Sequence, residues 1–76
     1  MDWDNLRYFL ELARSGTLAA AAARAGVEHT TVARRIQLLE KQMGAPLFAR
    51  EASGHRLTEA GRQLLPAVEA MESAVL

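Results

Sequence analysis

The chain has 76 residues, with nine basic and nine acidic side chains and no cysteine. This length limits it to one small domain, and the lack of cysteine excludes a disulfide framework and a thiolate metal site. Half of the residues are hydrophobic but only 5% are aromatic. The core must therefore be built from aliphatic side chains and alanine, which favours packed helices.

No membrane segment or secretion signal is expected. The longest apolar run, residues 18–23, is far shorter than the roughly 20 residues that a membrane helix needs. The first residues lack the basic and apolar regions of a signal peptide. We therefore expect a cytoplasmic protein that does not contact a membrane.

The charge is unevenly distributed along the chain. A net charge of zero argues mildly against a nucleic-acid partner, because such proteins are usually basic. However, residues 24–62 hold seven of the nine basic side chains and only four of the nine acidic ones. The middle of the chain therefore carries an excess of three positive charges, which suits either an anionic partner or an ordinary solvated surface.

The first half of the chain predicts two helices. Residues 3–15 form the first, capped by Asp2, with Leu6, Phe9, Leu10 and Ala13 on one buried face. Residues 18–25 form a short second helix, whose alanines allow a neighbouring helix to approach closely.

A third helix is predicted over residues 29–42. Its core face carries Val32, Ile36, Leu39 and Met43, at spacings of four, three and four. The opposite face carries hydrogen-bonding and cationic groups and no acidic residue. It consists of Thr30, Arg34, Gln37 and Lys41, flanked by Thr31 and Ala33.

A hairpin and a fourth helix follow. Pro46 ends the third helix, and residues 48–50 and 56–57 read as two short strands around a turn at residues 52–55. The hairpin would bring Arg50, His55 and Arg56 together. Thr58 can cap the fourth helix, which Pro66 should kink. Its apolar positions, Ala60, Leu64, Val68, Met71 and Val75, form a seam.

These elements predict a mainly α fold, a winged helix-turn-helix with a three-helix core and a two-stranded wing, followed by a long linker helix. Residues 1–57 would form the winged helix-turn-helix domain and residues 58–76 the long helix that follows it. The linker helix ends without a stop signal, which indicates that it continues beyond this chain. A third helix placed in this way fits the DNA major groove.

Four motifs carry a resemblance to a known family: "LRYF", "AAAARAGV", "TTVARRIQLLEKQMGAPLFAR" and "LTEAGRQLLP". Together they resemble the N-terminal DNA-binding region of LysR-type transcriptional regulators over nearly the whole chain. The resemblance implies sequence-specific binding to a pseudo-palindromic operator of double-stranded DNA, and a homodimer formed through the linker helix. A small-molecule effector would bind only a larger C-terminal domain that is absent from this chain.

The resemblance places base recognition at the start of the third helix, with Arg34 keeping the family's arginine. Glu28 is a poor helix cap, and Ala19 stands where Ser or Thr usually caps the second helix, which can shift that cap to Thr17. Ala33 stands where Ser is usual and cannot donate a hydrogen bond. The predicted DNA-binding residues are His29, Thr30, Thr31, Ala33, Arg34, Gln37, Lys41, Arg50, His55 and Arg56, and the predicted dimerisation residues are Leu64, Val68, Met71 and Val75.

Each of these assignments has a structural alternative. Arg34 could pair with Glu40 or Gln37, and His29 could simply face water. Thr30 and Thr31 could cap the third helix in place of Glu28. The remaining cations could be surface charge without a partner, and the seam of the fourth helix could pack back on its own domain.

The sequence contains no catalytic constellation. His29 and His55 are its only histidines, and neither belongs to a metal-ligand pattern such as H-E-x-x-H; there is also no phosphate loop or nucleophile elbow. We therefore expect neither an enzyme nor a cofactor. The alternative function is a helical protein-interaction or dimerisation module without DNA binding, which would suit the zero net charge and Glu28.

Overall fold

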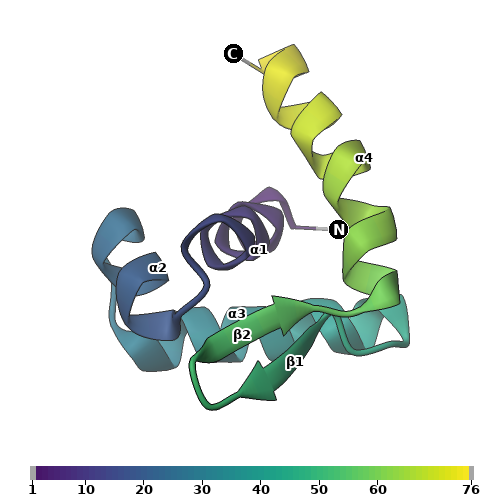
Figure 1. Cartoon of the computed structure of the whole chain (residues 1–76). Coiled ribbons are helices and arrows are strands. Elements are labelled where there is room, and N and C mark those ends of the chain that lie inside the picture. The colour runs from purple at the N-terminus through teal and green to yellow at the C-terminus, as the bar shows by residue number, and fades with distance from the viewer. Residues whose placement is uncertain (1, 76) are drawn as a thin grey trace.

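A computed structural model describes residues 2–75, with side chains up to residue 74. Three helices pack into one body, an antiparallel hairpin lies along one edge, and a long helix leads away from it (Figure 1). The predicted mainly α, winged helix-turn-helix fold is confirmed. The elements are α1 (Trp3–Ser15), α2 (Leu18–Ala25), α3 (His29–Met43), β1 (Phe48–Glu51), β2 (Gly54–Leu57) and α4 (Glu59–Val75).

Side-chain caps start three of the helices. The Asp2 carboxylate accepts a hydrogen bond from the Asp4 amide at 2.9 Å, and the Thr17 hydroxyl accepts one from Ala20 at 3.1 Å. The Thr58 hydroxyl does the same for the Gly61 amide at 3.2 Å. Such a cap contributes about 1 kcal/mol. Glu28 makes no cap bond at the start of α3, as its residue type predicted.

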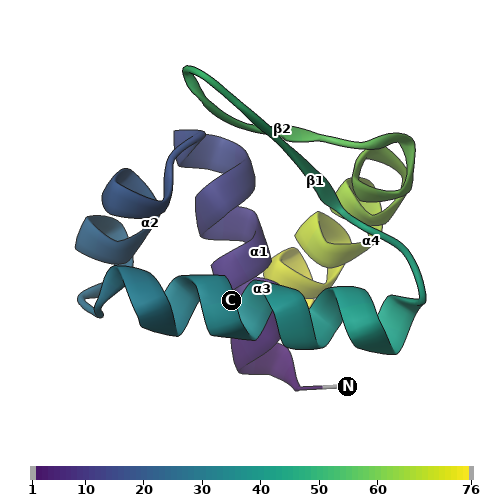
Figure 2. The same ribbon diagram turned by 90° about the horizontal axis from the view of Figure 1, so that it is seen from below.

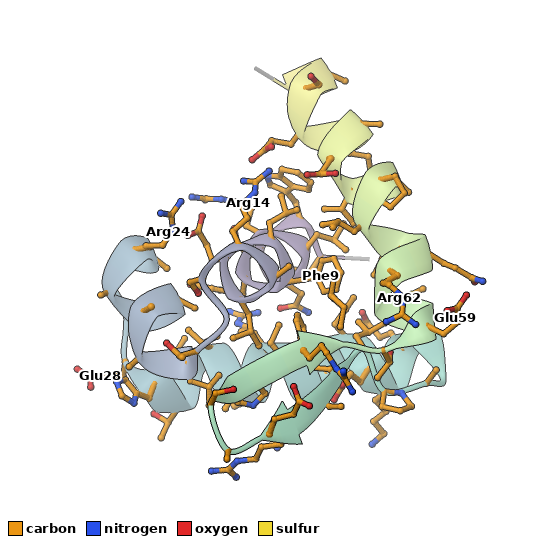
Figure 3. The ribbon with its side chains drawn as sticks, viewed as in Figure 1. Phe9, Arg14, Arg24, Glu28, Glu59 and Arg62 are labelled. Carbon is orange, nitrogen blue, oxygen red and sulfur yellow. The ribbon has the colours of Figure 1, made fainter. Side chains whose placement is uncertain are left out.

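The core is a single cluster centred on α1, with Phe9 fully buried in the middle (Figure 3). Leu6 and Leu10 are buried as predicted. Leu12 and Asn5 are buried as well, which the spacing along α1 did not predict. The reason is that α1 contacts α2, α3, α4 and β2, so that more than one of its faces is covered.

Helix α3 packs on this core through Val32, Ile36 and Leu39, all of which are buried. Seen from below, α1 crosses near the middle of α3 (Figure 2). The prediction that Met43 belongs to the core is wrong, because this side chain is 39% exposed. Met43 is the last residue of α3, beyond the stretch of the helix that packs on α1.

The wing is an antiparallel pair of strands in which Phe48 lies opposite Leu57 and Arg50 lies opposite His55. The strands are longer than predicted, because Gly54 and His55 belong to β2 and not to the turn. Only Ala52 and Ser53 remain in the turn.

The first part of helix α4 packs on the core, and the rest of the helix extends away from it. Val68 is fully buried and Leu64 is half-buried against the same cluster. The prediction that Val68 contacts a partner chain is therefore wrong, since its own domain covers it, whereas the prediction for Leu64 stays untested because this side chain is only partly covered. Met71 is 41% exposed, and the side chain of Val75 lies outside the described residues. The helix continues through Pro66 as one element.

Beyond Val68, an ion pair attaches α4 to α1. The Arg14 guanidinium donates two hydrogen bonds to the Glu72 carboxylate, at 2.8 and 3.0 Å, and lies 3.9 Å from Glu69. The hydrogen bond from Arg14 holds the pKa of the Glu72 carboxyl below its ordinary value of 4.5. No helix of the described chain combines the length and the apolar character that crossing a bilayer requires.

Val68→Ala should lower the free energy of unfolding by about 2 kcal/mol, because it removes two buried methyl groups and leaves a cavity. Leu38→Ala is the control, because Leu38 is 41% exposed and such a change stays within about 0.5 kcal/mol. Urea unfolding measures both. Equal, small effects would contradict the placement of α4 in the core.

Glu72→Gln should flatten the pH dependence of stability. Because its folded-state pKa is lowered, the carboxylate stabilises the native chain above its ordinary pKa of 4.5, and this contribution is lost as the pH falls through the lowered pKa. The wild-type chain should therefore lose more stability than the variant between about pH 6 and pH 3. Urea unfolding across this range is the measurement, and Glu28→Gln should keep the wild-type profile.

Candidate nucleic-acid interface

The outward face of α3 is open to solvent along its whole length. Thr30, Arg34, Gln37 and Lys41 are all exposed, and Thr31 and Ala33 beside them are half-buried. The buried residues of the same helix lie on its opposite side. The predicted polar face is therefore free to meet a ligand and is not packed against the chain itself.

Ion pairing separates the cations of this face from the others. All Lys and Arg residues fall within the described part of the chain, and among them only Arg34, Lys41 and Arg50 make no ion pair there. Two of them lie on the outward face of α3 and the third lies on the neighbouring strand β1. They are the charges that remain available to an anionic partner.

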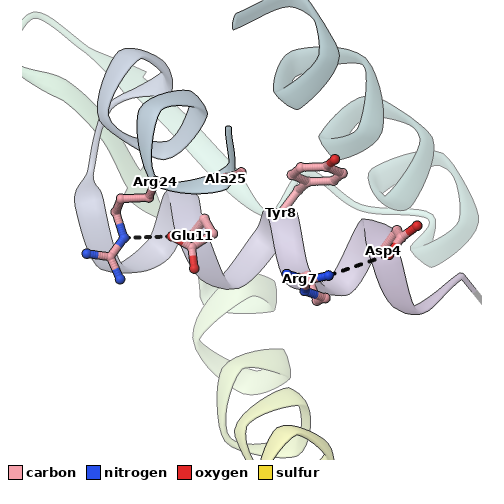
Figure 4. A pocket seen from close by; sticks show the side chains of 6 residues that line it. All are labelled: Asp4, Arg7, Tyr8, Glu11, Arg24 and Ala25. Carbon is pink, nitrogen blue, oxygen red and sulfur yellow. Dashed lines mark hydrogen bonds and ion pairs between the residues drawn. The ribbon is translucent and has the colours of Figure 1, made fainter. Parts of the chain in front are cut away.

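A pocket on another side of the molecule shows the opposite arrangement. It measures about 260 Å³, between α1 and the end of α2. Arg24 donates to Glu11 at 2.6 Å, and Arg7 lies 3.9 Å from Asp4 (Figure 4). Since acidic neighbours already neutralise both cations, this pocket has no free positive charge for an anion.

The two adjacent arginines of α3 have different roles. The Arg35 guanidinium donates to the side chains of Asp2, at 3.3 Å, and Asn5, at 3.2 Å, and it thereby ties α3 to the start of α1. Asn5 is buried. Arg34 makes no such bond to the described residues and is exposed to solvent. The sequence alone did not reveal this role of Arg35, because its partners are distant in the chain.

Glu40 anchors the wing to α3. Its carboxylate accepts hydrogen bonds from the backbone amides of Leu47, at 2.7 Å, and Phe48, at 3.3 Å. The proposed alternative in which Arg34 pairs with Glu40 or Gln37 is not observed. Within residues 2–75, the side chains of His29, Thr30 and Thr31 also make no hydrogen bond to the chain itself.

The wing presents only part of the predicted set to α3. Arg50 and His55 are cross-strand partners, so they share one face of the hairpin. Arg56 faces the opposite way and lies 3.5 Å from Glu51. All three residues lie on the hairpin, as predicted, but Arg56 does not share the face of Arg50 and His55.

Two hollows lie between α3 and the wing. A groove of about 250 Å³ is lined by Ala33 and Gln37 from α3 and by Arg50 and His55 from the wing, among others. A second hollow of about 360 Å³ reaches the start of α3, and His29, Arg50 and His55 also line it. A concave strip with imidazole and guanidinium groups at its edge suits a sugar-phosphate backbone.

The family model for bacterial regulatory helix-turn-helix proteins of the lysR family matches residues 3–62. The chain belongs to this family. The family consists of transcriptional regulators and not of enzymes.

Relatives with assigned roles agree with this. The chain is 41% identical to the transcriptional regulator HdfR of Yersinia enterocolitica over 73 residues. This aligned segment covers 96% of this chain and 25% of that protein. The chain is also 40% identical over 74 residues to the Mau operon transcriptional activator of Paracoccus denitrificans, covering 97% of this chain and 26% of that protein. The chain thus spans about a quarter of the length of these relatives.

Solved structures of the same fold include complexes with DNA. The DNA-binding domain of CbnR, in complex with DNA, superposes with a TM-score of 0.93 at 33% identity, over 99% of this chain and 86% of that one. The DNA-binding domain of BenM on the benA site 1 DNA gives a TM-score of 0.93 at 25% identity, over 99% of this chain and 87% of that one.

Proposed function

We propose that this chain binds double-stranded DNA sequence-specifically, as the DNA-binding domain of a LysR-type transcriptional regulator. Residues 29–42 would lie in the major groove, with the wing on the sugar-phosphate backbone. The main support is the position of the free cations. Within the described chain, three cations make no ion pair, and they lie on α3 (Arg34 and Lys41) and on the adjacent wing (Arg50). The DNA-binding domains of CbnR and BenM, which share this fold, form complexes with DNA, and this supports DNA as the partner.

Base recognition falls to the first half of α3. Arg34 is exposed and has no side-chain partner among the described residues, and a guanidinium can bind guanine O6 and N7 with two hydrogen bonds, which discriminates by about 1–3 kcal/mol. Thr30, Thr31 and Gln37 supply further polar groups on the same side, His29 adds an exposed imidazole at the start of the helix, and the methyl group of Ala33 suits contact with a thymine methyl.

Phosphate contacts fall to the wing and to the second half of α3. Arg50 and His55 line both hollows beside α3, and Lys41 extends the positive face toward the end of the helix. Such contacts fix the position of the protein on DNA without reading its sequence. Because Arg56 is paired with Glu51 on the far side of the hairpin, we give it at most a peripheral role.

We also infer a homodimer through α4, on a face that shares Met71 with the predicted seam but is displaced around the helix from it. Val68 is buried and Leu64 is half-buried within their own chain, so the partner would meet mainly the exposed residues Ala67, Ala70, Met71 and Ala74. Their spacing of three and four defines one helix face. Two chains would then place two copies of α3 on a pseudo-palindromic site in the cytoplasm, and a small-molecule effector would bind a further domain of the whole protein.

The function is tested by titrating the chain into a duplex at about 50 and 200 mM salt, where releasing counterions from several phosphates makes affinity fall steeply. We expect tighter binding at low salt and, from a random pool of duplexes, selection of a common half-site. Negligible binding at both salt concentrations would contradict the proposal and would favour a protein-interaction module.

Alanine substitutions of Arg34 and Arg50 should change DNA binding in different ways. Arg34→Ala should relax sequence preference at one position by about 1–3 kcal/mol, whereas Arg50→Ala should weaken binding to every duplex and reduce the salt slope by about one. Competition titrations with the selected duplex and its single-base variants measure both effects. Identical behaviour of the two variants would refute this division of roles.

Ala70→Glu should weaken self-association without unfolding the chain, because it places a charge on the exposed face of α4. Sedimentation equilibrium would show the shift toward monomer. Ala52→Glu adds the same charge at the exposed turn of the wing and should leave the association constant unchanged. A shift of similar size in both variants would argue against this face.

A further inference from the structure

The tip of the wing is attached to the turn between α1 and α2. The backbone amide of His55 donates a hydrogen bond to the carbonyl oxygen of Gly16 at 2.7 Å. In Figure 1 the chain between α1 and α2 comes down to the start of β2. This bond joins two segments that are far apart in the sequence, and it lies at the end of the hairpin that projects furthest from the base of the wing.

Only glycine fits at position 54 next to this bond. Its φ of +141° is a conformation that residues with a side chain rarely adopt. In addition, a Cβ atom at this position would overlap the carbonyl oxygen of Gly16 and lie 3.2 Å from Cγ2 of Thr17. Any side chain at position 54 must therefore push the wing away from the turn.

The base of the wing is fixed independently. The Thr58 amide donates to the carbonyl of Leu47 at 3.0 Å, the Thr58 hydroxyl donates to the carbonyl of Pro46 at 2.6 Å, and Glu40 holds the start of β1. Loss of the contact at the tip would therefore leave a hairpin that is attached at its base and free to swing at its tip. Arg50 is close to that tip, opposite His55.

We propose that Gly54 is a positioning residue for DNA binding. It seats the wing on the Gly16 carbonyl, and this contact holds Arg50 beside the outward face of α3, where both can meet one duplex. Gly54 itself touches no nucleotide in this account and acts through Arg50. The inference rests on the proposed DNA-binding function.

A double-mutant cycle tests the inference, because it separates an effect through Arg50 from a general one. Gly54→Ala, Arg50→Ala and the double variant are titrated with the selected duplex at two salt concentrations. We expect Gly54→Ala to weaken binding by about tenfold, the scale of one charge-assisted contact. Its salt slope should fall by about one, and in the Arg50→Ala background it should cause no further loss.

Gly44→Ala is the matched control. Gly44 also has a positive φ, of +74°, but an added Cβ would meet open space there. This variant carries a comparable backbone strain away from the wing tip and should keep the wild-type affinity and salt slope. An additive loss in the double variant, or unchanged binding by a folded Gly54→Ala chain, would overturn the inference. Absence of binding by the wild-type chain would instead overturn the proposed function.

Because backbone strain alone is enough to threaten the folding of Gly54→Ala, the wild-type chain supplies a second test. The His55 amide should be protected from hydrogen exchange, and the backbone amide of Arg50 should have an NMR order parameter near 0.85, as in rigid structure. An unprotected His55 amide, or an Arg50 order parameter below about 0.6, would refute the seating of the wing.

Discussion

The packing of α3 on α1 is the interaction on which the rest of the structure depends. Val32, Ile36 and Leu39 are buried against a core that contains Phe9. Burying an aliphatic side chain of this size contributes about 1.5–3 kcal/mol. Three of them therefore make a contribution that is large compared with a total stability of about 5–15 kcal/mol. Since burying one face of a helix turns the other outward, this packing sets which residues α3 presents to a partner.

The electrostatic character of that face follows from where the acidic residues lie and not from the net charge. Carboxylates pair with Arg14, Arg24, Arg35 and Arg62 on other parts of the molecule, whereas none lies on the outward face of α3. With no net charge on the whole chain, long-range attraction to DNA should be weak. If the chain binds DNA as proposed, short-range contacts of the three cations that make no ion pair within residues 2–75 must supply most of the affinity.

The elements and the outward face of α3 could be predicted from the sequence because both follow from local periodicity. The spacing of Val32, Ile36 and Leu39 fixes the buried side of α3, and therefore also the exposed position of Arg34. Periodicity does not show, however, how far along a helix the element that packs on its apolar face extends. Met43 continues the apolar pattern beyond the core, and Val68 belongs to a seam that its own domain covers.

The contacts that hold the wing could not be predicted for a related reason. Glu40 bonds to the amides of Leu47 and Phe48, and Gly54 lies against Gly16. These pairs are set by the tertiary arrangement, and neither residue belongs to a local pattern that identifies its partner. Arg35 is a further case, because its sequence context resembles that of Arg34 while its partners are in α1.

The most direct measurement of the central claim is an NMR titration of the isotope-labelled chain with a duplex selected from a random pool. If the outward face of α3 and the wing form the interface, the largest shift changes should occur at Thr30, Arg34, Gln37 and Arg50, while the outer residues of α1 and α4 remain unchanged. Shift changes concentrated on α1 or α4, with α3 unaffected, would contradict the account.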